Sequence, residues 1–164
     1  MSLSIALALG ISAVGVGVAL ATSIRAYREY VQQGDQRRTE LFFSLRARLK
    51  EDDLAWIAEL IDLATEGKAE EIAEAEQELA EVSLRHKRDY VGLFEEVATF
   101  MGTGQIKRED AHYMFGYYAL LCEECLAFWN NINYDSIYWK RFHDFCAEMR
   151  EMRNTLACPW KTPA

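Results

Sequence analysis

Residues 90–101 read YVGLFEEVATFM, and this stretch decides the fold class. Its apolar side chains recur at intervals of three and four, the spacing that places them on one face of an α-helix. They are Tyr90, Leu93, Phe94, Val97, Phe100 and Met101. We expect one long helix from about residue 69 to residue 101, with an acidic and sparsely apolar first half. Gly102 and Gly104 predict its end.

Helical spacing extends outward from this stretch in both directions, and no segment alternates apolar and polar residues long enough to predict a strand. Further helices are expected over residues 36–49, from Asp52–Asp53 to Gly67, over residues 108–130 and over residues 135–155. These elements predict an antiparallel helical bundle of about four to five helices over residues 36–156. Residues 157–164 are expected to form a C-terminal tail.

The N-terminal segment carries no charged side chain before Arg25. Residues 2–24, SLSIALALGISAVGVGVALATSI, are long enough to cross the hydrocarbon core, which takes about 20 helical residues. We therefore expect an all-α protein with a transmembrane helix over residues 1–24 and a juxtamembrane connector over residues 25–35. A cleaved signal peptide is the alternative, because Ala19-Leu20-Ala21 resembles an A-x-A cleavage site. The lack of Lys and Arg ahead of the apolar run favours an uncleaved anchor.

Basic residues follow the expected span directly, whereas none precedes it. They are Arg25, Arg28, Arg37, Arg38, Arg46, Arg48 and Lys50. The positive-inside rule then predicts a single-pass protein of the inner (cytoplasmic) membrane, with its N-terminus outside and its C-terminal domain in the cytoplasm. Residues expected at the membrane–water interface are Arg25, Tyr27, Arg28 and Tyr30.

Small residues recur along one side of the expected span. They are Ala6, Gly10, Ala13, Gly17 and Ala21, at intervals of four, three, four and four. Such a stripe allows two transmembrane backbones to approach closely. We interpret it as a packing face, although Ala and Gly are also common in transmembrane helices.

The composition excludes some classes of partner. The chain has 18 basic and 26 acidic residues and a formal net charge of -8. This balance argues against nucleic acid as a partner. No P-loop, dinucleotide-binding fingerprint or paired Glu-x-x-His motif is present. We therefore expect no catalytic residues and no cofactor.

The cysteines offer the one alternative chemistry. Cys122 and Cys125 form a C-x-x-C pair, a spacing that elsewhere indicates zinc binding or thiol redox chemistry. His143 and Cys146, on the next expected helix, would complete a Cys3His metal site. We favour the interpretation that these thiols are small buried apolar groups, because no second C-x-x-C is present and the pair is expected inside a helix.

Aromatic residues are concentrated between Tyr113 and Phe145, more of them than two helices can bury on their inner faces. Tyr and Trp are enriched at protein interfaces. The candidates for a partner contact are Tyr134, Tyr138, Trp139 and Trp160.

Three sequence features occur together in this part of the chain: the segment Tyr90-Val-Gly-Leu-Phe-Glu-Glu-Val-Ala, the break Gly104-Gln-Ile, and Phe115-Gly-Tyr followed by Trp129. They resemble an uncharacterised bacterial family of single-pass membrane proteins with a cytoplasmic helical domain. The resemblance covers about residues 36–150. It implies the same topology, and because that family has no established activity it implies no site residues.

Together these features predict a non-catalytic, membrane-anchored accessory or scaffold subunit that packs against integral membrane proteins of a larger complex. Energy-transducing complexes, photosynthetic or respiratory, are one class of host that such a subunit would fit. Two alternatives remain open: a membrane-tethered thiol-redox or metal-binding protein that uses Cys122 and Cys125, and a self-associating signalling scaffold.

Overall fold

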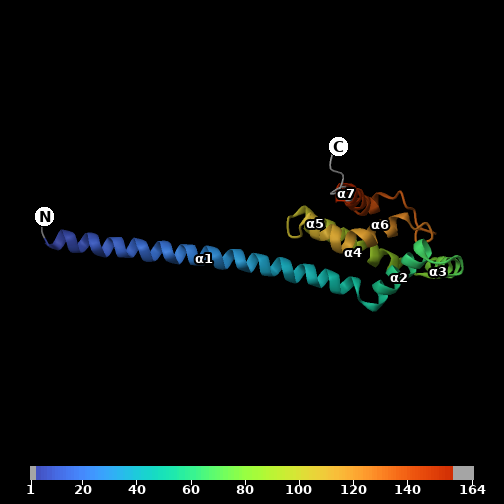
Figure 1. The fold of residues 1–164 in the computed structure, drawn as a ribbon, viewed down its shortest axis with the longest axis horizontal. Helices are drawn as coiled ribbons and strands as arrows, with labels where there is room; N and C mark the ends of the chain where they lie inside the picture. Colours follow the sequence, from blue (N-terminus) through green and yellow to red (C-terminus); the bar gives the residue numbers. More distant parts are fainter. Residues whose placement is uncertain (1–2, 157–164) are drawn as a thin grey trace, which may run out of the picture. The chain divides into compact units, whose positions relative to one another are not determined.

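The computed structural model describes the backbone of residues 3–156 and the side chains of residue 20 and residues 22–156. Within this range the chain is helical and contains no strand, as predicted (Figure 1). The elements are α1 (Leu3–Leu49), α2 (Asp52–Glu66), α3 (Ala69–Glu81), α4 (Leu84–Gly102), α5 (Arg108–Ala111), the π-helix η1 (His112–Gly116), α6 (Tyr117–Glu124), the 3-10 helix η2 (Ile137–Trp139) and α7 (Lys140–Leu156). The chain divides into two compact units, Met1–Leu41 and Phe42–Ala164.

The first unit consists of α1 up to Leu41. We expected a connector over residues 25–35 and a separate helix from residue 36, but the helix is continuous through both. No proline interrupts it, and an Arg25–Glu29 ion pair at i,i+4 supports the helix locally (2.9 Å). Gly34 lowers helix propensity by only about 1 kcal/mol relative to Ala, which one residue in a long helix tolerates.

The expected transmembrane span falls largely outside the described side chains. Among the residues that the structure describes, no helix combines the length and the apolar character that a membrane crossing needs. The expected packing face at Ala6, Gly10, Ala13, Gly17 and Ala21 also lies outside the described side chains, as does Trp160. The topology predicted for residues 1–24 therefore stays a prediction.

The second unit is a helical bundle. Helix α2 begins at Asp52 and ends before Gly67, as predicted, and a two-residue link connects it to α3, against which it packs. Helix α4 packs on α2 and α7, and α6 packs on α2 and α7. Of the six residues predicted on the apolar face of α4, Tyr90, Leu93, Phe94 and Val97 are buried, whereas Phe100 and Met101 at its end are half-buried.

One helix was expected over residues 69–101, but two are present. Helix α3 ends at Glu81 and α4 begins at Leu84. Ser83 caps α4, because its hydroxyl oxygen accepts a hydrogen bond from the backbone N–H of His86 (3.3 Å). Val82 is buried at the break, so the chain turns there without exposing the apolar side chain. The sequence pattern did not predict this break, because apolar residues keep helical spacing on both sides of it.

The helix expected over residues 108–130 is also shorter than predicted. It runs through α5, η1 and α6 and ends at Glu124. The indole N–H of Trp129 donates to the backbone carbonyl of Cys122 (2.8 Å), one of the last carbonyls of α6, which have no partner within the helix. The chain therefore leaves the helix at Cys125 and folds back on the end of α6, and α7 begins at Lys140 rather than at Asp135.

A cluster of aromatic rings forms the core. Tyr90, Phe94, Phe128, Phe142 and Phe145 are fully buried. Ring centroids of Tyr90 and Phe94 lie 5.2 Å apart, and those of Phe94 and Phe142 lie 5.9 Å apart. Aromatic pairs at these separations contribute about 0.5–1.5 kcal/mol each beyond the area that they bury. The core therefore joins α4, the segment after α6, and α7.

Candidate functional site

Two adjacent hollows lie along α4 and share Glu95 and Tyr138. The first has a volume of about 580 Å³ and is lined by Leu84, Arg88, Glu95, Asn131, Ile132, Asn133, Ser136, Tyr138 and Trp139. The second has a volume of about 740 Å³ and is lined by Gly92, Glu95, Glu96, Thr99, Ile137, Tyr138, Lys140, Arg141 and Asp144. We call the two together the α4 groove. Volumes of this size match those of small-ligand pockets and can equally receive side chains of a partner protein.

The rim of the α4 groove is held by the short helix η2. The side chain of Trp139 is buried, and its indole N–H donates to the carbonyl of Asn133 (3.1 Å). The hydroxyl of Ser136 caps η2 by accepting from the backbone N–H of Tyr138 (3.4 Å). This anchor turns the two residues before Trp139 outward: Ile137 is 80% exposed and Tyr138 is 83% exposed.

The loop that leads into η2 depends on one residue with an unusual backbone. Asn131 has a φ of 64°, in the left-handed region. Asn tolerates this region better than most residues because its short polar side chain bonds locally. The loop therefore returns toward α4 and places Asn131 and Asn133 in the lining of the groove.

Glu95 is the acidic group common to both hollows. Its side chain is half-buried, and burial raises its pKa, while the nearby Arg141 guanidinium and the Phe142 backbone act in the opposite direction. Its neighbours are already paired: Glu96 with Arg48 (2.6 Å) and Lys140 with Asp144 (2.8 Å). Among the described residues Glu95 forms no ion pair, so a Lys or Arg entering the groove would find an acceptor there.

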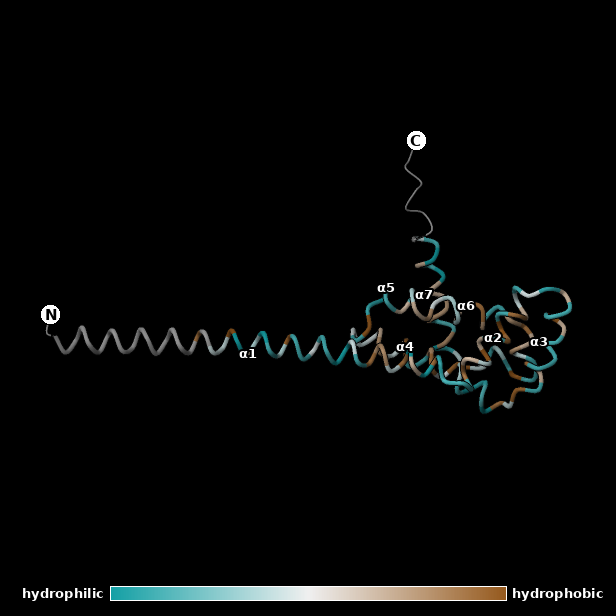
Figure 2. Tube along the Cα trace, turned by 60° about the horizontal axis from the view of Figure 1, so that its bottom comes forward, coloured by the Kyte–Doolittle hydropathy of each residue, from teal (hydrophilic) through white to brown (hydrophobic). Residues whose placement is uncertain are grey.

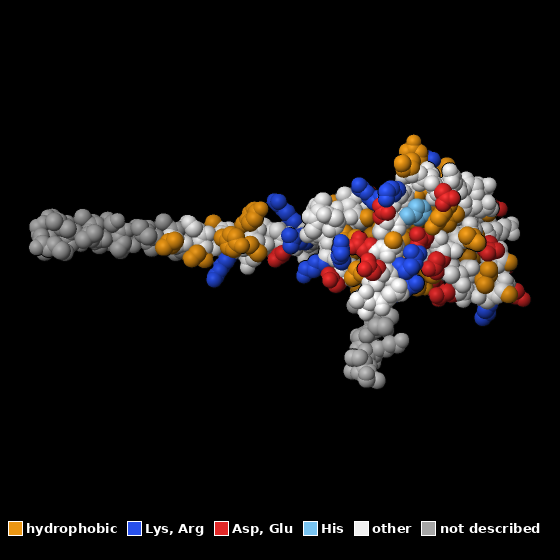
Figure 3. All heavy atoms as spheres, turned by 90° about the horizontal axis from the view of Figure 1, so that it is seen from above, with side chains coloured by type: hydrophobic (Ala, Val, Ile, Leu, Met, Phe, Trp, Pro, Cys, Tyr) orange, Lys and Arg blue, Asp and Glu red, His pale blue; other side chains and the backbone are white. Residues whose placement is uncertain are grey.

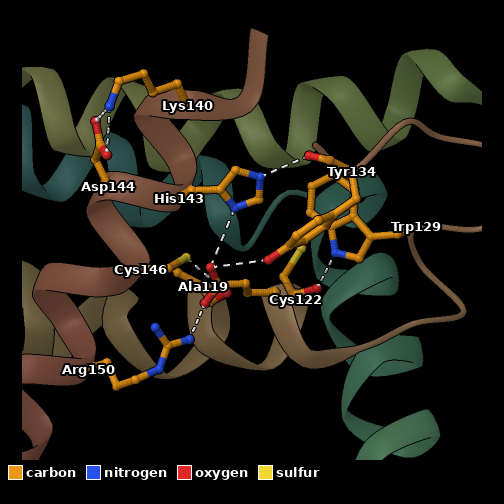
Figure 4. A network of polar contacts seen from close by, with 10 residues as sticks. Ala119, Cys122, Trp129, Tyr134, Lys140, His143, Asp144, Cys146 and Arg150 are labelled. Carbon is orange, nitrogen blue, oxygen red and sulfur yellow. Dashed lines mark hydrogen bonds and ion pairs between the residues drawn. The ribbon is translucent and has the colours of Figure 1, made fainter. Parts of the chain in front are cut away.

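A second polar cluster is built around Glu123 at the end of α6 (Figure 4). Its carboxylate pairs with the Arg150 guanidinium and accepts a long hydrogen bond from the Tyr134 hydroxyl (3.4 Å). Nδ1 of His143 lies 3.4 Å from Oε1 of Glu123 without forming a hydrogen bond, while Nε2 lies 3.0 Å from the Tyr134 carbonyl oxygen. The Glu123 hydrogen bond raises the pKa of Arg150. The cluster ties α6, the following loop and α7 together.

Three thiols lie in the core next to this cluster. Burial raises the pKa of Cys122, Cys125 and Cys146. Reactive cysteines show the opposite shift, toward the thiolate. The Cys146 thiol contacts the carbonyl oxygen of Ala119 (3.6 Å), which fixes its direction (Figure 4). These positions suit packing rather than redox chemistry.

The Cys3His set considered from the sequence is not assembled. Across the described residues, no three His, Cys, Asp or Glu side chains are grouped so that they could hold a metal ion. Cys125 caps the end of α6 instead of lying within the helix, and His143 is directed toward Glu123 and Tyr134.

Helix α4 contributes two buried polar side chains, Lys87 and Tyr90, that lie beside the thiols. Lys87 is buried with its ammonium group 5.6 Å from the centre of the Phe128 ring, and burial lowers its pKa. The Tyr90 hydroxyl is buried without a hydrogen-bond partner in the described part of the chain, and burial raises its pKa. Since both groups are enclosed, no substrate reaches them in this conformation.

The structure separates the aromatic residues that the sequence grouped as partner contacts. Tyr138 is exposed, Tyr134 is at the limit of exposure and packs on Trp129 and His143, and Trp139 is buried. The expected interface residues Arg25, Tyr27, Arg28 and Tyr30 are all exposed on α1. Sequence reasoning missed Ile137 and Glu95, although an apolar residue directly before Tyr138 at a helix start was a usable signal.

No protein family, no curated protein and no solved structure matches the chain.

Proposed function

We propose that the chain is a non-catalytic, membrane-anchored accessory or scaffold subunit, and that the α4 groove is the surface through which its domain binds a protein of a larger membrane complex. The observation that carries this proposal is the outward placement of Ile137 and Tyr138 beside two hollows. Aromatic residues placed over a pocket are typical centres of binding energy at protein interfaces.

The residues around the groove support binding rather than catalysis. Lys140, Asp144, Glu96 and Arg48 are committed to ion pairs, and Arg141 donates to the hydroxyl of Thr99 (2.7 Å). Glu95 remains as an acceptor for a basic side chain. We therefore expect a partner segment that presents apolar side chains to Ile137 and Tyr138 and a Lys or Arg to Glu95.

The anchor is proposed from the sequence. Residues 2–24 contain no charge, and Arg25 and Arg28 begin the basic flank. An anchor of this kind restricts the domain to the membrane surface, where integral membrane subunits are its nearest partners. The proposed small-residue face from Ala6 to Ala21 would pack on one of their helices.

Site-specific photocrosslinking in native membranes tests this proposal. A photoreactive amino acid in place of Tyr138 is expected to crosslink to a defined integral membrane protein, identified by mass spectrometry. The adduct should fall about tenfold when Ile137→Ser is added, since losing a central interface contact costs roughly 1–2 kcal/mol.

The matched control is the same photoreactive residue in place of Tyr113, which is equally exposed and is not part of the groove lining. Equal adducts from positions 113 and 138, or adducts that persist with Ile137→Ser, would contradict docking at the α4 groove. Release of the full chain from membranes by alkaline carbonate would contradict the anchor.

A further inference from the structure

Four apolar side chains of α1 lie on one face of the helix and are exposed. Leu20 is 59% exposed, Ile24 54%, Tyr27 69% and Val31 42%. We call these four residues the α1 seam. Figure 3 shows hydrophobic side chains (orange) gathered on the coloured part of α1 next to the grey stretch. Figure 2 shows hydrophobic residues (brown) set among hydrophilic ones (teal) in the same stretch.

The spacing of the seam is that of a coiled coil. The residues follow one another at intervals of four, three and four, and at about 100° per residue they occupy an arc of about 60°. The far side of the helix carries the Arg25–Glu29 ion pair, with Arg25 83% exposed. Arg28 and the exposed Tyr30 flank the seam at the e and g positions, so the side chains beside the seam are amphipathic, as at the edges of a coiled-coil core.

The residue types indicate how many helices meet at the seam. In heptad notation Ile24 and Val31 occupy a positions, and Leu20 and Tyr27 occupy d positions. β-Branched residues at a together with Leu at d favour parallel two-stranded coiled coils. The seam ends where Gly34 and Arg38 take the next d and a positions, so the contact spans about two heptads.

We propose that the occupant of the α1 seam is the same seam of a second copy of this chain, in a parallel two-helix coiled coil. The parallel orientation rests on the proposed membrane anchor, because two copies inserted with the same topology run in the same direction. In this arrangement the g position of one helix faces the e position of the other in the next heptad. Tyr30 of one copy then lies beside Asp35 of the second, where its hydroxyl can donate to the carboxylate.

Disulfide crosslinking of the full chain in native membranes tests the seam. Ile24→Cys, Tyr27→Cys and Val31→Cys are made singly in a Cys158→Ser background, in which the remaining native cysteines are buried. The control is Glu29→Cys, which lies on the same helix at an outer position. After mild oxidation, each seam variant is expected to give about tenfold more covalent dimer than the control, because only core positions bring two Cβ atoms within disulfide reach.

The pattern along the seam also reports the orientation. Positions 24 and 31 are about 10 Å apart along the helix. An antiparallel pair can therefore bring only one of the two positions opposite its own copy. Four results would overturn the proposal. Two concern the seam itself: crosslinking at one seam position alone, or absence of dimer at all three positions. The others are dimer yields at position 29 equal to those at the seam, and crosslinks from the seam to a different protein.

Photocrosslinking at Tyr138 and carbonate extraction measure the proposed function separately. Seam dimers without a Tyr138 adduct would retain the coiled coil and overturn docking at the α4 groove. A Tyr138 adduct without seam dimers would retain docking at the α4 groove and overturn the coiled coil. If seam dimers form but alkaline carbonate releases the chain from membranes, the self-association would be confirmed, and its parallel orientation could not be attributed to membrane insertion.

Discussion

Helix α4 and the α1 stretch from residue 20 to residue 41 carry apolar residues at similar helical spacing but differ completely in burial. Tyr90 and Phe94 of α4 are fully buried, whereas Tyr27 and Tyr30 of α1 are among the most exposed aromatic residues described. In α4 the rings meet Phe128, Phe142 and Phe145 from later in the chain. Periodicity therefore predicts which face of a helix needs a partner, while the rest of the chain decides whether that partner is its own.

The first test of this comparison removes one aromatic ring from each region. Phe94→Ala should lower the free energy of unfolding of the domain by about 3–5 kcal/mol, because the ring is fully buried and leaves a cavity. Tyr27→Ala should leave that free energy unchanged. Urea unfolding of the full chain in detergent, followed by tryptophan fluorescence, measures both, since Trp56, Trp129 and Trp139 all lie in the second unit. A comparable loss from Tyr27→Ala would show that α1 and the domain unfold as one unit.

The second test compares two Arg–Glu pairs. The Glu123 side chain is mostly buried and pairs with Arg150, whose guanidinium is partly exposed. Arg150→Met should lower the free energy of unfolding by about 1–3 kcal/mol, because it leaves a mostly buried carboxylate without its charge partner, while exposure of the guanidinium limits the effect. Arg25→Met, which breaks the exposed Arg25–Glu29 pair, should cause no measurable change. The same urea unfolding measurements serve for both variants. Equal losses of unfolding free energy would contradict the expected difference between the mostly buried pair and the exposed pair.

The third test uses pH and concerns only the second unit. The pKa values of the Cys122 and Cys125 thiols are raised in the folded chain, so above pH 9.0, where unfolded thiols ionise, the unfolded state releases more protons than the folded one. Stability should therefore fall as the pH rises beyond 9.0. Cys122→Ala with Cys125→Ala should cost about 1–2 kcal/mol at neutral pH, from lost packing.

The double variant isolates the thiols from the other groups that titrate in the same range. Its stability loss relative to the parent chain should shrink as the pH rises from 9.0 toward 10.5. A constant difference across this range would mean that the thiols ionise as readily in the folded chain as in the unfolded one. Membrane association and the Tyr138 adduct should persist in this variant, and loss of either without loss of stability would favour the thiol-based function.

What the sequence determined by itself is the helical class and the inner faces of the helices. The i,i+3 and i,i+4 spacing of Tyr90, Leu93, Phe94 and Val97 is a local property, and all four residues are buried as predicted. The start at Asp52 and the ends at Gly67 and Gly102 also follow from local backbone preferences. The absence of charge before Arg25 is likewise visible in the sequence alone.

What only the tertiary structure decided is where helices stop against their neighbours and which aromatic residues remain outside. The end of α6 depends on a hydrogen bond from Trp129. Gly116 suits the close packing of η1 on α7, because an added Cβ would lie 3.4 Å from the Met149 sulfur and 3.2 Å from the His112 ring. Tyr138 and Trp139 are adjacent and of similar propensity, yet one is exposed and the other buried. Their difference arises from the contacts of Trp139 with Trp129 and Asn133, because ring packing and this hydrogen bond form only when the irregular loop before η2 folds back on itself, which no helical or strand periodicity predicts.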